Sequence, residues 1–269
     1  MGRLQRAVEL IGRTPGLLHW RKSRFEKSFV AGRVAGCCHG VYGSFQEAAA
    51  AAPRTQPLGY DHDDGGAMYR DRLFRVYPSD YAMMFWVQKL VAGGARRIFD
   101  FGGHIGLSYY AYDRMQPLPA DLSWQVCDLP AIVKAGREEA RKLDPSGRLG
   151  FADDFSGAAE ADVLFTAGCV QFIEPKLSDK VAGLSRKPKW ILVNLLPLSD
   201  QPEYWTVMSI GTAFCPYRIQ NTQSFLDEFA RLGYEVQDRW ENLDKDCWVA
   251  FEPGYSLDRY HGVALRLKD

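Results

Sequence analysis

The sequence lacks net charge, clustered cysteines and long apolar runs, and each absence excludes a class of protein. Its 33 Lys and Arg residues balance 33 Asp and Glu residues, so no overall field would draw the chain to nucleic acid. No apolar run approaches the roughly 20 residues that cross a bilayer. The six cysteines form no CxxC pair and no Cys/His ligand spacing, so we expect reduced thiols, no bound metal and a cytoplasmic protein.

Two nucleotide-binding signatures are also missing. The chain contains no Gly-Lys-Ser/Thr, which excludes a P-loop. No tyrosine is followed four residues later by lysine, the proton-relay spacing of short-chain dehydrogenases.

Residues 1–75 are predicted to form a helical segment on the substrate side of a larger domain, residues 76–269. Basic side chains dominate its first 35 residues: Arg3, Arg6, Arg13, Arg21, Lys22, Arg24, Lys27 and Arg33. Such a run favours a solvated helical face, with contact to an anionic membrane or an acidic substrate as the alternative. The Pro-, Gly- and Asp-rich stretch 53–67 is either a linker or a substrate-side loop that brings together Asp61 and His62.

The rest of the chain is organised around the stretch from Arg97 to Gly106. An apolar run of strand type breaks into the turn Gly102-Gly-His-Ile-Gly106, and the residues that follow contain no helix breaker. A buried strand, a glycine turn and a helix N-terminus together form a cradle for a nucleotide-like ligand. S-adenosylmethionine is the ligand that we expect.

Downstream, strands alternate with helices until the tail. Further strands are predicted at 122–128, 149–152, 162–171, 189–196, 234–241 and 261–268. The alternation indicates a Rossmann-like, doubly wound α/β sheet. The last two strands alternate with period two, so we expect an antiparallel pair that completes a seven-stranded sheet in the order 3-2-1-4-5-7-6.

Acidic residues follow two of these strands. Asp128 lies 22 residues after Gly106, where a carboxylate can accept hydrogen bonds from both ribose hydroxyls. Its alternative role is a helix N-cap. Asp153 and Asp154 end the next strand, where one could accept the adenine amino group while Phe155 covers the ring; the alternative is a solvated turn.

A dinucleotide-binding oxidoreductase is the nearest competing interpretation. Its G-x-G-x-x-G spacing, aligned so that the last glycine is Gly106, requires glycine where this chain has Phe101.

The successive motifs resemble those of S-adenosylmethionine-dependent O-methyltransferases. They are Phe99-Asp-Phe-Gly-Gly-His-Ile-Gly106, Cys127-Asp-Leu-Pro130, Asp153-Asp-Phe155 and Ala161-Asp-Val-Leu-Phe165. From about residue 40 onward, the chain is also similar to a bacterial methyltransferase family whose genes often lie near saccharide or natural-product genes. That similarity rests on Val41-Tyr-Gly-Ser-Phe-Gln-Glu-Ala48, Val170-Gln-Phe-Ile-Glu174 and Cys215-Pro-Tyr-Arg-Ile219.

The resemblance implies a class I methyltransferase fold and a set of cofactor-binding residues. These are Asp100, Gly102, Gly103, Gly106, Asp128, Leu129, Asp153, Asp154, Phe155 and Gly168. It also implies biosynthetic methylation of a small-molecule or saccharide acceptor, with oxygen favoured as the acceptor atom. Substrate contacts are expected from the N-terminal segment and from Gln171, Tyr217, Arg218 and Trp248.

Two departures from the related enzymes bear on catalysis. His104 stands where many of them have glycine, and histidine is among the better-tolerated residues at positive φ. Gln171 stands where small-molecule O-methyltransferases carry a catalytic histidine, and glutamine cannot take a proton. The candidate general bases are therefore His104, His62 and Asp61. A cofactor-binding partner subunit without catalysis is the remaining alternative.

Overall fold

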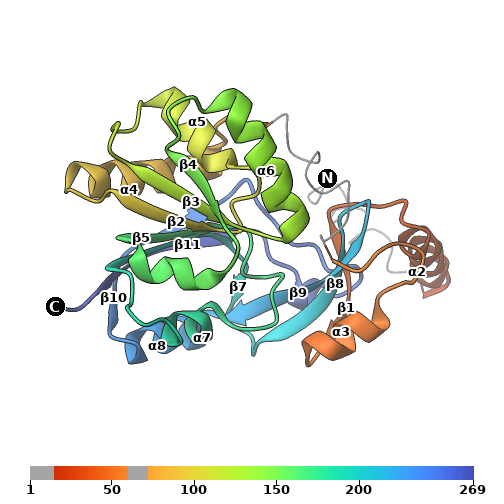
Figure 1. Cartoon of the computed structure of the whole chain (residues 1–269). Coiled ribbons are helices and arrows are strands. Elements are labelled where there is room, and N and C mark those ends of the chain that lie inside the picture. The colour runs from red at the N-terminus through yellow and green to blue at the C-terminus, as the bar shows by residue number, and fades with distance from the viewer. Residues whose placement is uncertain (1–14, 60–71) are drawn as a thin grey trace.

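The computed structural model describes residues 15–59 and 72–269, and most of them belong to a three-layer α/β body (Figure 1). Its central sheet has the strand order β10-β11-β6-β5-β2-β3-β4. The strands are β2 (Arg97–Phe101), β3 (Ser123–Cys127), β4 (Leu149–Ala152), β5 (Val163–Ala167), β6 (Trp190–Leu196), β10 (Tyr234–Asn242) and β11 (Tyr260–Leu267). Strands β2 to β6 are parallel, and β11 is antiparallel to both of its neighbours. Counted from β2, this is the order 3-2-1-4-5-7-6, so the sequence-based prediction is confirmed.

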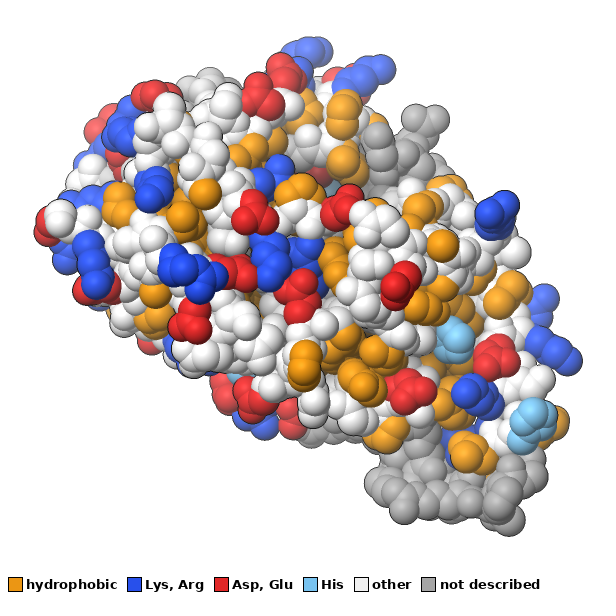
Figure 2. Space-filling view, turned by 90° about the horizontal axis from the view of Figure 1, so that it is seen from below, with side chains coloured by type: hydrophobic (Ala, Val, Ile, Leu, Met, Phe, Trp, Pro, Cys, Tyr) orange, Lys and Arg blue, Asp and Glu red, His pale blue; other side chains and the backbone are white. Residues whose placement is uncertain are grey.

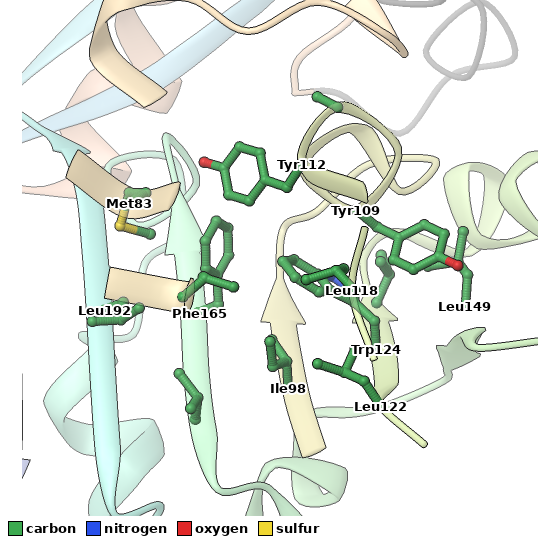
Figure 3. Packing of buried hydrophobic residues seen from close by; sticks show 14 of the residues in the cluster. Met83, Ile98, Tyr109, Tyr112, Leu118, Leu122, Trp124, Leu149, Phe165 and Leu192 are labelled. Atoms are coloured by element: carbon green, nitrogen blue, oxygen red, sulfur yellow. The ribbon is translucent and has the colours of Figure 1, made fainter. Parts of the chain in front are cut away.

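Helices cover both faces of this sheet (Figure 1). On one face lie α4 (Tyr81–Ala92), α5 (Leu107–Met115) and α6 (Pro130–Leu143), and on the other lie α7 (Leu177–Ala182) and α8 (Thr222–Arg231). Side chains alternate between the two cores: Ile98 and Phe165 pack under the first group of helices, and Phe99 and Leu164 under the second. Figure 3 shows Trp124 in the first core, close to Ile98 and Phe165. Burying each large apolar side chain stabilises the fold by about 1.5–3 kcal/mol.

Helix α4 is apolar on nearly every side, but only one side is buried. Met83, Trp86 and Leu90 are buried against the sheet. Tyr81 and Phe85 are 56% and 60% exposed. The reason is geometric, because a helix in an outer layer covers the sheet with a single stripe.

A second, four-stranded sheet lies beside the first (Figure 1). It has the order β1-β8-β9-β7, with β1 (Cys37–Tyr42), β7 (Leu198–Ser199), β8 (Tyr204–Ser209) and β9 (Phe214–Asn221). Helices α2 (Pro15–Val30) and α3 (Phe45–Ala51) pack against one face through a core that includes Phe29, Trp205 and Phe214. The N-terminal segment is helical at α2 and α3, as expected, but β1 lies between them and corrects the expectation that the whole segment is helical.

This second sheet joins segments that are far apart in the sequence. Strand β1 pairs antiparallel with β8 on one side. On its other side, Cys38 N–H donates to Trp248 O at 2.9 Å, and Ala250 N–H donates to Cys38 O at 2.8 Å. Because strand pairing crosses position 75, the predicted division into 1–75 and 76–269 is not a division between sheets; as a division into domains it stays a prediction.

The described surface carries mixed charge. Acidic and basic side chains are interspersed over the face shown in Figure 2. On α2, Lys22, Arg24 and Lys27 are exposed, whereas the basic residues at positions 3, 6 and 13 lie outside the described residues. Membrane contact by this segment stays a prediction. Within residues 15–59 and 72–269, no helix combines the length and the apolar composition that spanning a membrane requires.

Candidate functional site

The glycine loop between β2 and α5 owes its shape to three residues in the left-handed region. Gly102, His104 and Gly106 have φ values of 76°, 56° and 93°. A Cβ on Gly102 would lie 2.3 Å from Cys169 Cβ, and one on Gly106 would lie 2.7 Å from Leu149 Cδ2. Glycine is therefore required at both positions for conformation and for space. His104 is a non-glycine residue of a type that the left-handed region tolerates comparatively well.

Asp128 follows β3 and lies against this loop. Its Oδ2 accepts the backbone N–H of His104 at 2.8 Å, and its Oδ1 accepts the N–H of Leu129 at 2.7 Å. The carboxylate does not cap α6, because Leu129 is the N-cap and no side chain caps that end. Burial raises the pKa of Asp128, and the two backbone hydrogen bonds oppose that shift. Among the described residues each oxygen accepts one hydrogen bond, which leaves a second lone pair on each for ligand hydroxyls.

Asp100 supports the loop from within the sheet. It is 1% exposed, and its Oδ2 accepts Trp124 Nε1–H at 3.0 Å, while Oδ1 has no hydrogen-bond partner among the described residues. Burial raises the pKa of Asp100 to about 8. A Cβ on Gly103 would lie 2.3 Å from Asp100 Oδ2, so glycine at 103 lets the loop pass directly over this carboxyl group.

Of the residues predicted to hold adenine, Asp153 and Asp154 are exposed, and their carboxylates already have protein partners, whereas Phe155 is half-buried. Asp153 Oδ1 accepts Arg137 Nη2–H at 2.8 Å. Asp154 Oδ1 accepts Ser156 N–H at 2.8 Å and caps the short 3-10 helix Phe155–Glu160. The Phe155 ring packs edge-on against Phe101, with ring centroids 5.0 Å apart. Adenine contact by these three residues stays a prediction.

On the other side of the sheet's carboxyl edge lie Gly168 and Gln171, which follow β5. Gly168 has φ of 77°, and its N–H donates to Asn194 O at 3.0 Å. Gln171 is 3% exposed, and its Oε1 has no hydrogen-bond partner among the described residues. Its backbone O accepts Arg218 N–H at 2.8 Å, so the loop after β5 is fastened to β9. This bond joins the two sheets at the edge where such folds bind ligands.

The structure places Arg218 on the face of the second sheet that carries Trp205, and not toward Gly168. Its guanidinium carbon lies 4.4 Å from the Trp205 ring centroid, and its Nε lies 3.7 Å from Glu203 Oε1. Lys176 extends this group, with its Nζ 3.1 Å from Glu203 and 2.6 Å from Glu228. The chain thus provides Arg218 with structural partners, and substrate contact by it stays a prediction.

Tyr217 and Trp248 are both buried. The hydroxyl groups of Tyr217 and Tyr260 lie 2.6 Å apart, and the Tyr217 ring packs edge-on against Phe172. Trp248 packs edge-on against Phe25 of α2, with ring centroids 5.4 Å apart. Tyr217 therefore belongs to the junction between the sheets, whereas Trp248 belongs to the core under α2.

Of the candidate bases, only His104 belongs to the described part of the chain. His62 and Asp61 lie outside it. His104 lies in the glycine loop with its backbone bonded to Asp128, so it stays a candidate for the reacting centre.

Asn194 and Leu195 at the end of β6 were not anticipated from the sequence. Asn194 is fully buried and accepts hydrogen bonds at Oδ1 from Trp240 Nε1–H at 2.9 Å and Asn242 Nδ2–H at 2.8 Å. Its Nδ2–H donates to Ser79 O at 2.7 Å. The sequence did contain a signal for Asn194, because it is the single amide inside the apolar run 190–196. A polar side chain in a buried strand needs hydrogen-bond partners, so its presence predicts a contact with another segment.

No protein-family model and no curated protein sequence matches this chain, whereas solved structures do. The 1,6-didemethyltoxoflavin-N1-methyltransferase of Burkholderia thailandensis, solved with its substrate and S-adenosylhomocysteine, has a TM-score of 0.50 at 15% identity; the match covers 77% of this chain and 83% of that one. The glycopeptide N-methyltransferase MtfA, complexed with S-adenosylmethionine, also has a TM-score of 0.50, at 10% identity over 73% and 97% of the two chains. This chain has the class I methyltransferase fold. Within that fold, the glycine loop and Asp128 occupy the carboxyl edge of the parallel strands.

Proposed function

We propose that this chain transfers a methyl group from S-adenosylmethionine to a small-molecule or saccharide acceptor, with oxygen favoured as the acceptor atom. One observation carries the proposal. Asp128 is held beside the left-handed glycine loop by two backbone N–H groups, and both of its oxygens keep acceptor capacity. A carboxylate in this place fits the two hydroxyls of a ribose, as the sequence predicted.

The chain's own contribution to such a reaction is alignment. When bound, S-adenosylmethionine supplies an electrophilic methyl carbon on a sulfonium that leaves as a thioether. Asp128 would hold the ribose, and the glycine loop would let the backbone approach the ligand closely. The second sheet would hold the acceptor in line with the methyl carbon, which is how positioning lowers the barrier of a displacement. A hydroxyl acceptor loses its proton, for which His104, His62 and Asp61 are the candidate bases.

Gln171 motivates a second candidate, a cofactor-binding subunit without catalysis. Its side chain is an amide at the place where related O-methyltransferases carry a histidine. A glutamine can orient an acceptor but cannot remove its proton. Turnover decides between the two: S-adenosylhomocysteine that accumulates only in the presence of an acceptor would exclude the non-catalytic subunit.

The buried Phe101 ring argues against an NAD(P)-dependent oxidoreductase. It is 8% exposed and fills the position that the dinucleotide-binding signature reserves for glycine. We expect titration calorimetry to show binding of S-adenosylhomocysteine and none of NAD or NADP. The reverse result would refute the proposal.

Asp128→Ala tests the ribose assignment. Losing a charged acceptor should weaken binding of S-adenosylhomocysteine by about 1–3 kcal/mol, which is a factor of roughly 5 to 150 in Kd. Asp121→Ala is the matched control, because Asp121 is an exposed carboxylate that pairs with Arg96 just before β3 begins. The control should bind like the wild type. Equal affinity of Asp128→Ala and wild type would contradict the role of Asp128.

A further inference from the structure

Two side chains flank Gly168 at the carboxyl edge of the sheet. A Cβ built on Gly168 would lie 3.4 Å from Leu195 Cδ1 and 3.8 Å from Gln171 Nε2. Leu195 is an apolar side chain that remains partly exposed, whereas Gln171 is 97% buried and its Oε1 has no hydrogen-bond partner among the described residues. A buried amide oxygen without a donor is costly, and a ligand that brings an N–H or O–H would relieve that cost.

Leu195 is held in a conformation that leucine seldom adopts. Its φ is 54°, in the left-handed region, and it lies next to Asn194, whose side chain is bonded to three residues in two other segments. The pairing of β6 with β11 also shifts register here, between His261 opposite Leu196 and Val263 opposite Val193. Backbone strain of this kind persists only where the surroundings enforce it, and it clusters at functional sites.

An apolar wall continues from Leu195 onto the second sheet. Its partly exposed members are Val41, Phe172, Leu195, Met208 and Leu257. Behind them, the Tyr217 and Tyr260 hydroxyls lie 2.6 Å apart and bond to each other.

Two thiols lie within the same cluster. The Cys38 and Cys247 sulfurs lie 3.5 Å apart, and burial raises the pKa of Cys38, so it stays a thiol. The ion pair of Arg218 lies on the opposite face of the second sheet, with Trp205.

We propose that the acceptor of the methyl group is a neutral, mainly apolar compound that binds against this wall and donates one N–H or O–H to Gln171 Oε1. Leu195 is then a specificity-determining residue that limits the shape of the acceptor, and Asn194 is the positioning residue that holds it. The inference rests on the proposed methyl transfer. It selects against saccharides, because a sugar needs many polar partners, whereas the wall is apolar and Gln171 Oε1 is the acceptor beside it that has no partner among the described residues.

Binding of matched compounds to the full-length protein, saturated with S-adenosylhomocysteine, tests the acceptor class. The panel consists of neutral bicyclic phenols and indoles, their carboxylated counterparts, and methyl glycosides, measured by calorimetry. At least one neutral compound should bind at least tenfold more tightly than its carboxylated counterpart, and the glycosides should not compete. Preference for glycosides or anions, or binding by no neutral compound, overturns the inference. Failure to bind S-adenosylhomocysteine would instead refute the proposed function.

Gln171→Leu separates recognition from packing. It should weaken binding of a phenol at least tenfold but leave binding of its methyl ether, which has no donor, within twofold. Gln237→Leu, an exposed glutamine of β10, is the matched control and should change neither. Equal losses for phenol and ether, or no loss for the phenol, would overturn the role of Gln171.

Leu195→Gly tests the shape of the wall. Glycine accepts the left-handed conformation without strain, so the variant should fold and bind S-adenosylhomocysteine within twofold of the wild type. It should bind bulkier neutral compounds at least fivefold better than the wild type does. Unchanged size selectivity in a folded variant would overturn the role of Leu195.

Discussion

The two sides of the candidate site are built in opposite ways. On the cofactor side, a loop of consecutive residues, 102–106, folds onto the carboxylate of Asp128, and the bonds that fix it are backbone N–H groups. On the proposed acceptor side, the wall combines β1, the loop after β5, the end of β6, β8 and Leu257, and the same loop after β5 carries the Gln171 amide oxygen, which has no partner among the described residues. The cofactor side is therefore local and polar, whereas the wall is apolar and is assembled from segments that are distant in the sequence.

This difference follows from the two ligands, because the cofactor is the same in every such enzyme and the acceptor is not. A ribose presents the same hydroxyls in every enzyme that binds it, so a short motif suffices to recognise it. An acceptor differs from enzyme to enzyme, and surfaces assembled from several segments change with any one of them. Asn194 lies between the two sides, because its backbone O accepts Gly168 N–H while its side chain is bonded to β10 and to the 3-10 turn that precedes α4.

Asn194→Ala should have the largest effect on stability, because it removes the side-chain hydrogen bonds at the position that lies between the two sides. The substitution leaves Trp240 Nε1–H, Asn242 Nδ2–H and Ser79 O without their partner. We expect the free energy of unfolding to fall by about 3 kcal/mol or more, measured by urea denaturation. Gln171→Leu removes a buried amide whose Oε1 has no hydrogen bond among the described residues, and it should change stability by less than about 1 kcal/mol. Equal losses for both variants would contradict the contrast between these two amides.

Asp100→Asn tests the cofactor side through pH. The pKa of Asp100 is raised by burial from 3.8 to about 8, so between these values the folded chain binds the proton more tightly than the unfolded chain. The free energy of unfolding should therefore fall as pH rises through this window, by at most about 1.4 kcal/mol per pH unit. The amide variant keeps an acceptor for Trp124 and should lose that slope. If the stabilities of the wild type and of Asp100→Asn, measured by thermal unfolding, changed in parallel with pH, Asp100 would not titrate in this pH range.

The smallest effect concerns His104, whose φ of 56° glycine adopts more easily than alanine does. His104→Gly should be more stable than His104→Ala by about 1 kcal/mol, measured by urea denaturation. Comparing the two variants cancels the loss of the imidazole and isolates the backbone contribution. A more stable alanine variant would mean that the loop relaxes out of the left-handed conformation.

The seven-stranded sheet could be predicted because its signals are local. Apolar runs such as 149–152 end at acidic residues or glycines, and the helices between them are amphipathic. The predicted strand 149–152 matches the observed β4, and the predicted strand 234–241 differs from β10 by one residue at its end. The glycine loop and Asp128 were predicted from spacing for the same reason.

The second sheet could not be predicted in this way. The stretch 37–42 contains Gly40 and is short, and it forms a strand only because residues 204–209 and 247–250 flank it. Tertiary pairing of this kind overrides local propensity. Burial of Gln171 and Arg218 likewise depends on β9 packing against the loop after β5, a contact that no window of sequence contains.

The pairing of β1 also has a consequence for synthesis of the chain. Strand β1 leaves the ribosome long before its neighbours at 204–209 and 247–250. Until they follow, β1 has an unpaired backbone, which is the kind of edge that promotes aggregation. The parallel strands β2 to β6 can pair without β1, so we expect the second sheet to acquire its structure after them. A chain cut before residue 247 would lose both the backbone partner of Cys38 and strand β11, which lies between β6 and β10, so both sheets would be incomplete.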